Sequence, residues 1–299
     1  MSGAAGPGGA AGPPPRPLEL TRLAAEHLAA KGVEEPRLDA ELLLAHVLGI
    51  RRLDLYLQFE RPLTPEEVAS YREAVRRRSR REPLQYITGT VGFRELELGV
   101  DARVLIPRPE TEVLVGAVLE WAEGRSGLVA LDIGTGSGAI ALSLLKEGPF
   151  ARVVATDVSP EALAVTRENA ARTGLAGGLE TREGALWAPV GDGERFDVIV
   201  SNPPYVAEAD RGTLQPEVAD HEPAAALFAG ADGLGVLRGI VEGAWSRLET
   251  GGLLAVEVGL GQAREVAGWL EAARFGAPRI VEDLTGRERV VLAARNGER

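Results

Sequence analysis

The sequence contains no cysteine, one methionine and three histidines among its 299 residues, and aromatic residues make up 5% of it. Without cysteine there can be no disulfide, no thiolate metal site and no cysteine nucleophile. Three histidines, His27, His46 and His221, are too few for a histidine-rich metal centre. We therefore expect no bound metal.

Long hydrophobic runs are also missing. No run approaches the roughly 20 apolar residues that a membrane-spanning helix needs. The first sixteen residues are rich in glycine, alanine and proline, carry Arg16 as their charge, and lack the apolar centre of a signal peptide. We predict a disordered tail at residues 1–16 and a cytoplasmic protein.

Negative charge predominates, with a formal net charge of −11, and it is spread unevenly. Residues 1–95 hold 14 Lys+Arg and 13 Asp+Glu, whereas the remainder holds 19 and 31. An acidic C-terminal part disfavours nonspecific wrapping of nucleic acid, because that binding depends on neutralising phosphates. We expect no direct nucleic-acid substrate, and a structured RNA–protein partner stays open.

Residues 17–82 have the periodicity of helices. Apolar residues stripe a first helix that ends near Gly32 and a second helix over 38–48. Residues 64–67 (Thr-Pro-Glu-Glu) predict a capping box that starts a third helix. That helix ends in a cluster of basic residues, Arg76, Arg77, Arg78, Arg80 and Arg81. The cluster indicates either a solvated helix end or a contact for an acidic or RNA-bearing partner, and the segment predicts a small helical domain.

Residues 83–107 carry short alternating stretches separated by proline and glycine, which predicts a β-hairpin linker. Within 108–299 the pattern becomes strand–helix–strand, which is typical of a parallel sheet with helices on both faces. The last two strands read as an antiparallel hairpin. The predicted strands are 128–133, 152–157, 179–183, 196–201, 252–258, 277–283 and 289–294, and the helices between them centre on 138–147, 160–173, 234–249 and 262–272.

The fourth predicted strand runs into Asn202-Pro203-Pro204-Tyr205, hereafter the proline turn. Two prolines forbid both a sheet ladder and a helix interior, so the chain turns stiffly where the strand ends. An amide, backbone carbonyls and an aromatic ring then gather at the carboxyl end of a strand, where open α/β sheets bind ligands. The alternative is a plain strand-ending turn.

The first predicted strand runs into residues 134–138 (Gly-Thr-Gly-Ser-Gly), hereafter the glycine loop, and then into a helix. Glycines allow a tight turn and close approach of a ligand at a helix N-terminus, which carries partial positive charge. The next strand ends in Asp157, whose carboxylate can accept two hydrogen bonds from a ribose diol. This order predicts a nucleoside-type cofactor.

A nicotinamide cofactor is the alternative, because Gly134-x-Gly136-x-x-Ala139 also satisfies the looser dinucleotide fingerprint. That interpretation has no nearby candidate for hydride chemistry. It also leaves the proline turn without a role.

The glycine loop, the strand ending at Asp157 and the proline turn, in this order, resemble the class I S-adenosylmethionine-dependent methyltransferases. More narrowly, the chain resembles the HemK-type glutamine methyltransferases that modify peptide chain release factors. The resemblance covers roughly residues 18 to 294. Its motifs are 82–89 (Glu-Pro-Leu-Gln-Tyr-Ile-Thr-Gly), 106–112 (Ile-Pro-Arg-Pro-Glu-Thr-Glu), Glu222-Pro223, Gly233-Leu234, 257–259 (Glu-Val-Gly) and the ending Asp283-Leu284-x-Gly286-x-x-Arg289.

The resemblance implies an α/β fold with a seven-stranded, Rossmann-like methyltransferase sheet at 108–299. It implies that a β-hairpin at 83–107 joins this sheet to an N-terminal helical bundle, 17–82, that recognises the substrate. The implied activity is methyl transfer from S-adenosyl-L-methionine to the side-chain amide nitrogen of the glutamine in the Gly-Gly-Gln motif of release factors. We expect a monomer, with release factors as its protein partners.

The resemblance also implies roles for individual residues. The glycine loop, Gly134, Thr135, Gly136, Ser137 and Gly138, lies against the amino-acid part of the cofactor, and Asp157 holds the ribose hydroxyls. Trp187 flanks the adenine, although by spacing alone it is equally a core or loop aromatic. The substrate amide is held by Asn202, Pro203, Pro204 and Tyr205, of which Asn202 also contacts the cofactor.

The implied chemistry needs positioning rather than acid–base catalysis. An amide nitrogen is a poor nucleophile because its lone pair is delocalised, whereas a sulfonium methyl group is a strong electrophile. Asn202 and Pro203 can accept the two amide protons through their oxygens, and Tyr205 can stack on the flat amide, which makes these three the candidate catalytic residues. His221 is interpreted as a surface loop residue rather than a base.

Two rival functions remain. A nucleic-acid methyltransferase acting on the exocyclic amine of adenine or guanine would use the same turn, because those bases also present a planar NH2 group. The acidic C-terminal part and the lack of a basic, aromatic-interleaved recognition domain stand against it. A binding module without catalysis is disfavoured by the intact proline turn.

Overall fold

The computed structural model describes residues 15–58 and 60–297, so the predicted tail at 1–16 lies almost wholly outside the described residues. The chain divides into two units, residues 1–88 and residues 89–299. Among the residues described, no helix is both long and apolar enough to cross a membrane.

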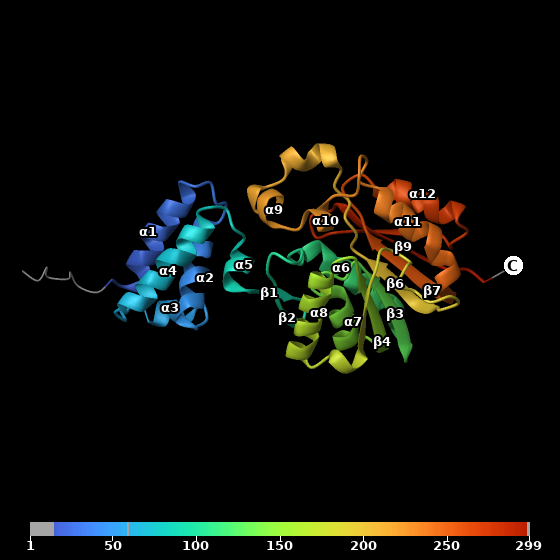
Figure 1. The fold of residues 1–299 in the computed structure, drawn as a ribbon, viewed down its shortest axis with the longest axis horizontal. Helices are drawn as coiled ribbons and strands as arrows, with labels where there is room; N and C mark the ends of the chain where they lie inside the picture. Colours follow the sequence, from blue (N-terminus) through green and yellow to red (C-terminus); the bar gives the residue numbers. More distant parts are fainter. Residues whose placement is uncertain (1–14, 59, 298–299) are drawn as a thin grey trace, which may run out of the picture. The chain divides into compact units, whose positions relative to one another are not determined.

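The first unit is helical, as predicted, and is coloured blue to cyan in Figure 1. Its three longest helices each have proline in the first turn, where the missing N–H costs nothing. They pack around a core that includes Leu28, Leu43 and Tyr71. The helices are α1 (Pro17–Ala29), α2 (Pro36–Leu48), α3 (Asp54–Leu57), α4 (Pro65–Arg78) and α5 (Leu84–Thr88).

The predicted capping box at the start of α4 is confirmed. The Thr64 hydroxyl accepts from the Glu67 N–H at 3.2 Å, and the Glu67 carboxylate accepts from the Thr64 N–H at 2.9 Å. Because Pro65 has no N–H, two of the three orphan donors at this helix end are thereby satisfied.

Arg76, Arg77 and Arg78, at the end of α4, pair with carboxylates of the same unit. Arg76 pairs with Glu73, and Arg77 pairs with Glu82. Arg78 is buried and donates to Asp39 of α2 at 2.7 Å. These pairs make part of the cluster a brace within the helical unit, and contact with a partner stays a prediction.

The hairpin segment differs at its start from the predicted 83–107 linker. Leu84–Thr88 forms α5 within the first unit, because the Tyr86 and Ile87 N–H groups both bond the Pro83 carbonyl. The hairpin itself is β1 (Thr90–Phe93) paired antiparallel with β2 (Leu96–Gly99). Sequence reasoning treated Pro83 as a break, whereas here it precedes a short helix.

The second unit contains the seven-stranded sheet that the sequence predicts. Its order is β5-β4-β3-β6-β7-β9-β8, in which β3 to β7 are parallel and β9 is antiparallel to both of its neighbours, β7 and β8. The α/β fold class is therefore confirmed. The strands are β3 (Leu128–Ile133), β4 (Phe150–Asp157), β5 (Leu179–Glu183), β6 (Phe196–Ser201), β7 (Leu248–Glu257), β8 (Arg279–Glu282) and β9 (Glu288–Ala294).

Helices cover both faces of this sheet (Figure 1). Alternate strand residues face the two sides, so Ala130 packs with α6, α7 and α8 while Leu131 packs with α11 and α12. Both layers are apolar and buried. The helices are α6 (Pro109–Ala122), α7 (Ala139–Glu147), α8 (Pro160–Thr173), α11 (Gly235–Ala244) and α12 (Ala263–Ala272), with 3-10 turns η1 (Ala176–Gly178) and η3 (Trp245–Arg247).

Residues 206–230, between β6 and α11, form a segment whose structure the sequence reasoning did not predict. The ends of the segment are joined, since the Val206 N–H bonds the Leu227 carbonyl and the Ala229 N–H bonds the Val206 carbonyl. Its elements are η2 (Glu208–Thr213), α9 (Pro216–His221) and α10 (Ala224–Leu227). We call it the strap.

Candidate active site

A cavity of about 420 Å³ lies where the parallel strands of the second unit end. Its walls come from the ends of β3, β4 and β6, from the segment before α6 and from the strap. Residues from the glycine loop, the end of β4 and the proline turn meet here, namely Gly134, Gly136, Asp157, Asn202, Pro203 and Pro204. These residues therefore line one cavity at the carboxyl edge of the sheet, where open α/β sheets bind ligands.

The glycine loop has the backbone that its composition predicts. Gly134, Gly136 and Gly138 have φ of 74°, 56° and 83°, a region that favours glycine. A Cβ at Gly138 would lie 3.0 Å from the Thr166 side chain, whereas at Gly134 or Gly136 it would meet no protein atom within 4 Å. Gly134 and Gly136 therefore leave open space beside bare backbone, which a ligand can occupy.

Asp157 holds this loop in place from the end of β4. One carboxylate oxygen accepts from the Gly136 N–H at 2.9 Å and the other from the Ser159 N–H at 3.0 Å. A carboxylate has about four lone-pair sites, so two stay available to a diol. Since Asp157 also lines the cavity, its environment fits the predicted contact with ribose hydroxyls.

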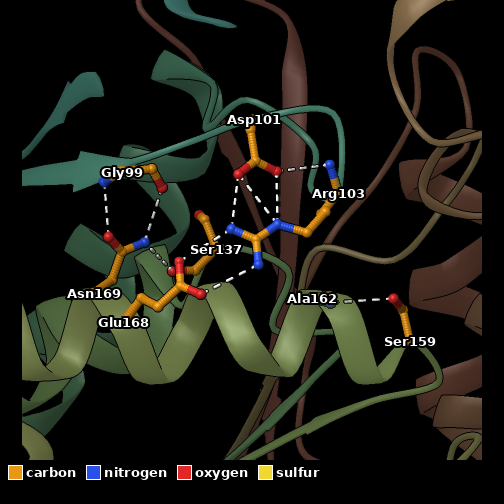
Figure 2. Close-up of polar contacts among 8 residues, drawn as sticks. All are labelled: Gly99, Asp101, Arg103, Ser137, Ser159, Ala162, Glu168 and Asn169. Carbon is orange, nitrogen blue, oxygen red and sulfur yellow. Dashed lines mark hydrogen bonds and ion pairs between the residues drawn. The ribbon is translucent and has the colours of Figure 1, made fainter. Parts of the chain in front are cut away.

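Asn169 of α8 connects the glycine loop to the hairpin segment, as Figure 2 shows. Its amide nitrogen donates to the Ser137 carbonyl at 2.9 Å and to the Gly99 carbonyl at 3.0 Å, while its oxygen accepts from the Gly99 N–H at 2.7 Å. Nearby, Arg103 lines the cavity and donates to Glu168 at 3.0 Å. Sequence reasoning missed Asn169, because a lone asparagine inside a helix carries no signal of its distant partners.

Asp132 lies beneath the glycine loop, fully buried at the end of β3. Burial raises the pKa of the Asp132 carboxyl to about 7, and the Thr135 hydroxyl, which donates to it at 2.7 Å, opposes that shift. Its second oxygen has no hydrogen-bond partner among the described residues. The Thr135 contact fixes the start of the loop from below.

The proline turn is held closely by its neighbours. Gln262 donates to the Tyr205 carbonyl at 3.1 Å and accepts from the Gly259 N–H at 2.8 Å. A Cβ at Gly233 would lie 2.4 Å from the Tyr205 carbonyl oxygen, so only glycine fits there. Two motif residues that sequence reasoning quoted without a role, Gly233 and Gly259, therefore border this turn.

The side chain of Asn202 is anchored by a hydrogen-bonded chain. Its amide nitrogen donates to the Thr111 hydroxyl at 2.9 Å, and that hydroxyl donates to Glu257 at 2.7 Å. Glu257 is fully buried at the end of β7, and burial raises the pKa of its carboxyl to about 7. Within the described residues nothing donates to the Asn202 amide oxygen, which leaves this acceptor for a ligand.

Tyr205 does not line the cavity with the rest of the turn. Its hydroxyl donates to Glu257 at 3.2 Å and its ring packs with the core layer of α11 and α12. Burial raises the pKa of the Tyr205 phenol, and the Glu257 carboxylate raises it further. Stacking of Tyr205 on a substrate amide stays a prediction.

Trp187 also lies off the cavity. Its indole N–H donates to the Gly239 carbonyl of α11 at 2.8 Å, and its ring packs against that helix. The neighbouring Leu186 lines the cavity instead, with a positive φ of 47°. A contact between Trp187 and an adenine stays a prediction, and Leu186 is a wall residue that sequence reasoning missed.

The strap is tied to the segment before α6 by a partly buried ion pair. Arg108 donates to Glu222 at 2.6 Å, joining two quoted motifs that lie 114 residues apart. Burial raises the pKa of Glu222, and the Arg108 guanidinium partly offsets this. His221, which precedes Glu222, is half-buried. Pro223, which follows Glu222, lines the cavity.

Comparison with known proteins is consistent with this geometry. A release factor glutamine methyltransferase of Geobacter sulfurreducens is 48% identical to the chain over 89% of it and 92% of the relative. One of Deinococcus radiodurans is 44% identical over 93% and 98%. The family models described as PrmC N-terminal domain and Methyltransferase small domain match residues 19–89 and 110–220.

A solved methyltransferase structure from Pyrococcus furiosus shares the fold, with a TM-score of 0.51 at 19% identity over 68% of this chain and 90% of that one. The two relatives are similar to the chain over nearly the whole length of each, which the shared fold alone would not require. On that similarity, the chain belongs to the family of release factor glutamine methyltransferases.

Proposed function

We propose that this protein transfers a methyl group from S-adenosyl-L-methionine to the side-chain amide nitrogen of the glutamine in the Gly-Gly-Gln segment of peptide chain release factors. The observation that carries the proposal is the uncommitted amide oxygen of Asn202 in the wall of a cavity that also exposes the glycine loop and Asp157. The names of relatives at 44% and 48% identity support the substrate.

The cavity residues fit S-adenosyl-L-methionine. Gly134 and Gly136 leave open space beside backbone, and Asp157 has acceptor sites to spare for a ribose diol. Apolar walls at Val158, Leu186 and Val236 suit the flat face of a base. When bound, this cofactor would supply an electrophilic methyl group on a sulfonium sulfur.

The proline turn would orient the substrate. The Asn202 amide oxygen and the Pro203 carbonyl accept the two hydrogens of the glutamine NH2 group, which fixes its plane and direction. Holding the nitrogen in line with the reacting bond converts a poor nucleophile into an adequate one by proximity. The same two oxygens stabilise the positive charge that develops on nitrogen as it is alkylated.

The helical unit, residues 17–82, would dock the release factor. Among the arginines at the end of α4, Arg80 is exposed, whereas Arg77 and Arg78 brace the unit through Glu82 and Asp39. Arg80→Glu should therefore raise the KM for the release factor and leave the Kd for the cofactor near the wild-type value. Unchanged KM would limit the cluster to a structural role.

Transfer of a labelled methyl group tests the proposed function. The protein is incubated with methyl-labelled cofactor, a release factor and bulk RNA and DNA, and the protein and nucleic-acid fractions are counted separately. Label should enter the release factor and should be lost when the glutamine of its Gly-Gly-Gln segment is replaced by alanine. Label confined to nucleic acid would overturn the proposal in favour of a base methyltransferase.

A further inference from the structure

We propose that Thr111 and Glu257 are positioning residues that fix which end of the Asn202 amide faces the substrate. The inference rests on the proposed function, in which the Asn202 oxygen accepts a hydrogen from the substrate amide. Thr111 and Glu257 act only through Asn202 and touch neither the substrate nor the cofactor.

The three residues form a continuous chain at one edge of the sheet. Ser201 of β6 pairs with Val256 of β7. The next residue in each case, Asn202 and Glu257, therefore lies at the same end of two neighbouring parallel strands. Thr111, in the first turn of α6, lies between them, 2.9 Å from the Asn202 nitrogen and 2.7 Å from a Glu257 oxygen. Thr111 is 3% exposed and Glu257 is fully buried, so water does not compete for the contact between them.

The direction of the hydrogen bonds follows from the chemistry of the groups. An ionised carboxylate can only accept, and both oxygens of Glu257 meet hydroxyl groups, those of Thr111 and Tyr205. The single hydrogen of the Thr111 hydroxyl is therefore used on Glu257, and its oxygen is left as an acceptor. Of the two ends of the Asn202 amide, only the NH2 group can satisfy that acceptor.

The consequence is a fixed amide orientation. If the Asn202 amide were turned over, its oxygen would face the Thr111 oxygen with no hydrogen between them. Its NH2 group would then face the substrate NH2 group, and two donors cannot bond. A buried carboxylate one residue removed from the contact thus determines that an acceptor is presented to the substrate.

The first test compares Thr111→Val with Thr111→Ser in single-turnover methylation of a release factor at pH 8, where the Glu257 carboxylate is mostly ionised. Valine keeps the shape and removes the hydroxyl, and loss of such an orienting contact should slow methyl transfer by roughly 10- to 100-fold. Serine keeps the hydroxyl and should remain near the wild-type rate. Cofactor Kd, measured by calorimetry, should change in neither.

A matched control is Thr173→Val, which removes a half-buried hydroxyl that bonds the Asn169 carbonyl within α8 and does not reach the proline turn. Its rate should stay near wild type. Equal slowing by Thr173→Val and Thr111→Val would mean that loss of any helix hydroxyl suffices, and would overturn the inference.

The second test separates this inference from the proposed function by combining Thr111→Val with Asn202→Ala. If Thr111 acts through Asn202, the double variant should be no slower than Asn202→Ala alone. If Asn202→Ala is slow but Thr111→Val transfers the methyl group at the wild-type rate, the positioning role alone is overturned. Wild-type rates in Asn202→Ala would overturn the role of the turn itself, and equal slowing by Thr111→Val in both backgrounds would make Thr111 merely structural.

A third comparison decides the question if Thr111→Val does not fold. In Asn202→Asp the new carboxylate needs a donor that Thr111, committed to Glu257, cannot supply. Adding Glu257→Gln provides an NH2 group that can donate to Thr111 and free its hydrogen for position 202. The double variant should therefore be several-fold faster than Asn202→Asp alone, and absence of rescue would overturn the inference.

Discussion

The two sides of the cavity are built by different means. The glycine loop is shaped by backbone, with positive φ at three glycines and N–H groups of Gly134 and Thr135 on the neighbouring Thr156 carbonyl at 2.8 and 2.9 Å. The proline turn is shaped by side chains, through contacts that span 91 residues to Thr111 and 146 residues from there to Glu257. A loop shaped by its backbone can be recognised from its local glycine content. A turn held by side chains from distant parts of the chain has no such local signal.

This difference predicts different responses to mutation. Replacing a side chain on the proline-turn side removes an oriented acceptor or its support, which changes turnover more than binding. Replacing a side chain on the glycine-loop side loosens a backbone cradle, which changes binding more than turnover.

The largest effect is expected at Asn202. Asn202→Ala should reduce single-turnover methylation by about 10²–10³ while cofactor binding stays near wild type, because one preorganised acceptor is lost. Asn202→Asp should be as slow as alanine, since its carboxylate cannot donate to Thr111. An aspartate variant far faster than the alanine variant would show that the NH2 group of Asn202 does not matter.

The next effect is expected at Asp157, on the other side of the cavity. Asp157→Ala should weaken S-adenosyl-L-methionine binding by roughly 10- to 100-fold, because each hydrogen bond to a charged group contributes about 1.5–3 kcal/mol. The rate at saturating cofactor should fall much less. Calorimetric titration is the measurement, and an unaltered Kd would remove Asp157 from the cofactor site.

Asn169 is an exception on the glycine-loop side, because its side chain supports the loop through contacts that are distant along the chain. Asn169→Ala leaves the Ser137 and Gly99 carbonyls and the Gly99 N–H without their partner. Unpaired buried groups should lower the free energy of unfolding by about 1–3 kcal/mol. Denaturant unfolding measures this, and an equally stable variant would mean that water replaces the amide.

The last predicted effect is a pH dependence of stability. Burial raises the pKa of Glu257 from 4.5 to about 7, so between these values the folded state holds a proton that the unfolded state has lost. The free energy of unfolding should therefore fall as pH rises from about 4.5 to 7, and level off above. Unfolding of wild type and Glu257→Gln at pH 5 to 8 measures it, with a shallower slope in the variant.

A second buried carboxyl explains why the slope should not vanish in the variant. Glu110 of α6 raises the pKa of Glu257 and Arg289 of β9 lowers it, but both influences end when Glu257 is replaced. Asp132, with a pKa also raised to about 7, contributes in the same direction. Asp283, with a pKa lowered to about 2, acts in a more acid window. An identical slope in both proteins would contradict burial of the Glu257 charge as its cause.

Much of the fold was predictable because its signals are local. All seven strands were predicted, six of them from short runs rich in β-branched or apolar residues, and α8 matches its predicted span of 160–173. The misses are short elements. Leu84–Thr88 and the strap helices have too few residues to express a helical period, so only their tertiary surroundings select them.

The site was predictable to the same extent and for the same reason. Gly134, Gly136, Asp157 and Asn202 meet in one cavity as predicted, because each lies at the carboxyl end of a parallel strand or in the loop after it. Trp187 and Tyr205 lie off the cavity wall. The sequence could not predict this, because spacing along the chain does not reveal where a ring points.

The sequence alone shows which chemical groups follow the strands, and in what order along the chain. A glycine turn that needs residues without a Cβ comes first, a carboxylate ends the next strand, and two prolines follow a later strand. Tertiary structure alone decided what supports these groups. Thr111, Asn202 and Glu257 come from a helix start and two strand ends far apart in the chain, and only the packed sheet brings them to within 3 Å. Hydrogen-bond direction depends on that proximity, so no local pattern could encode it.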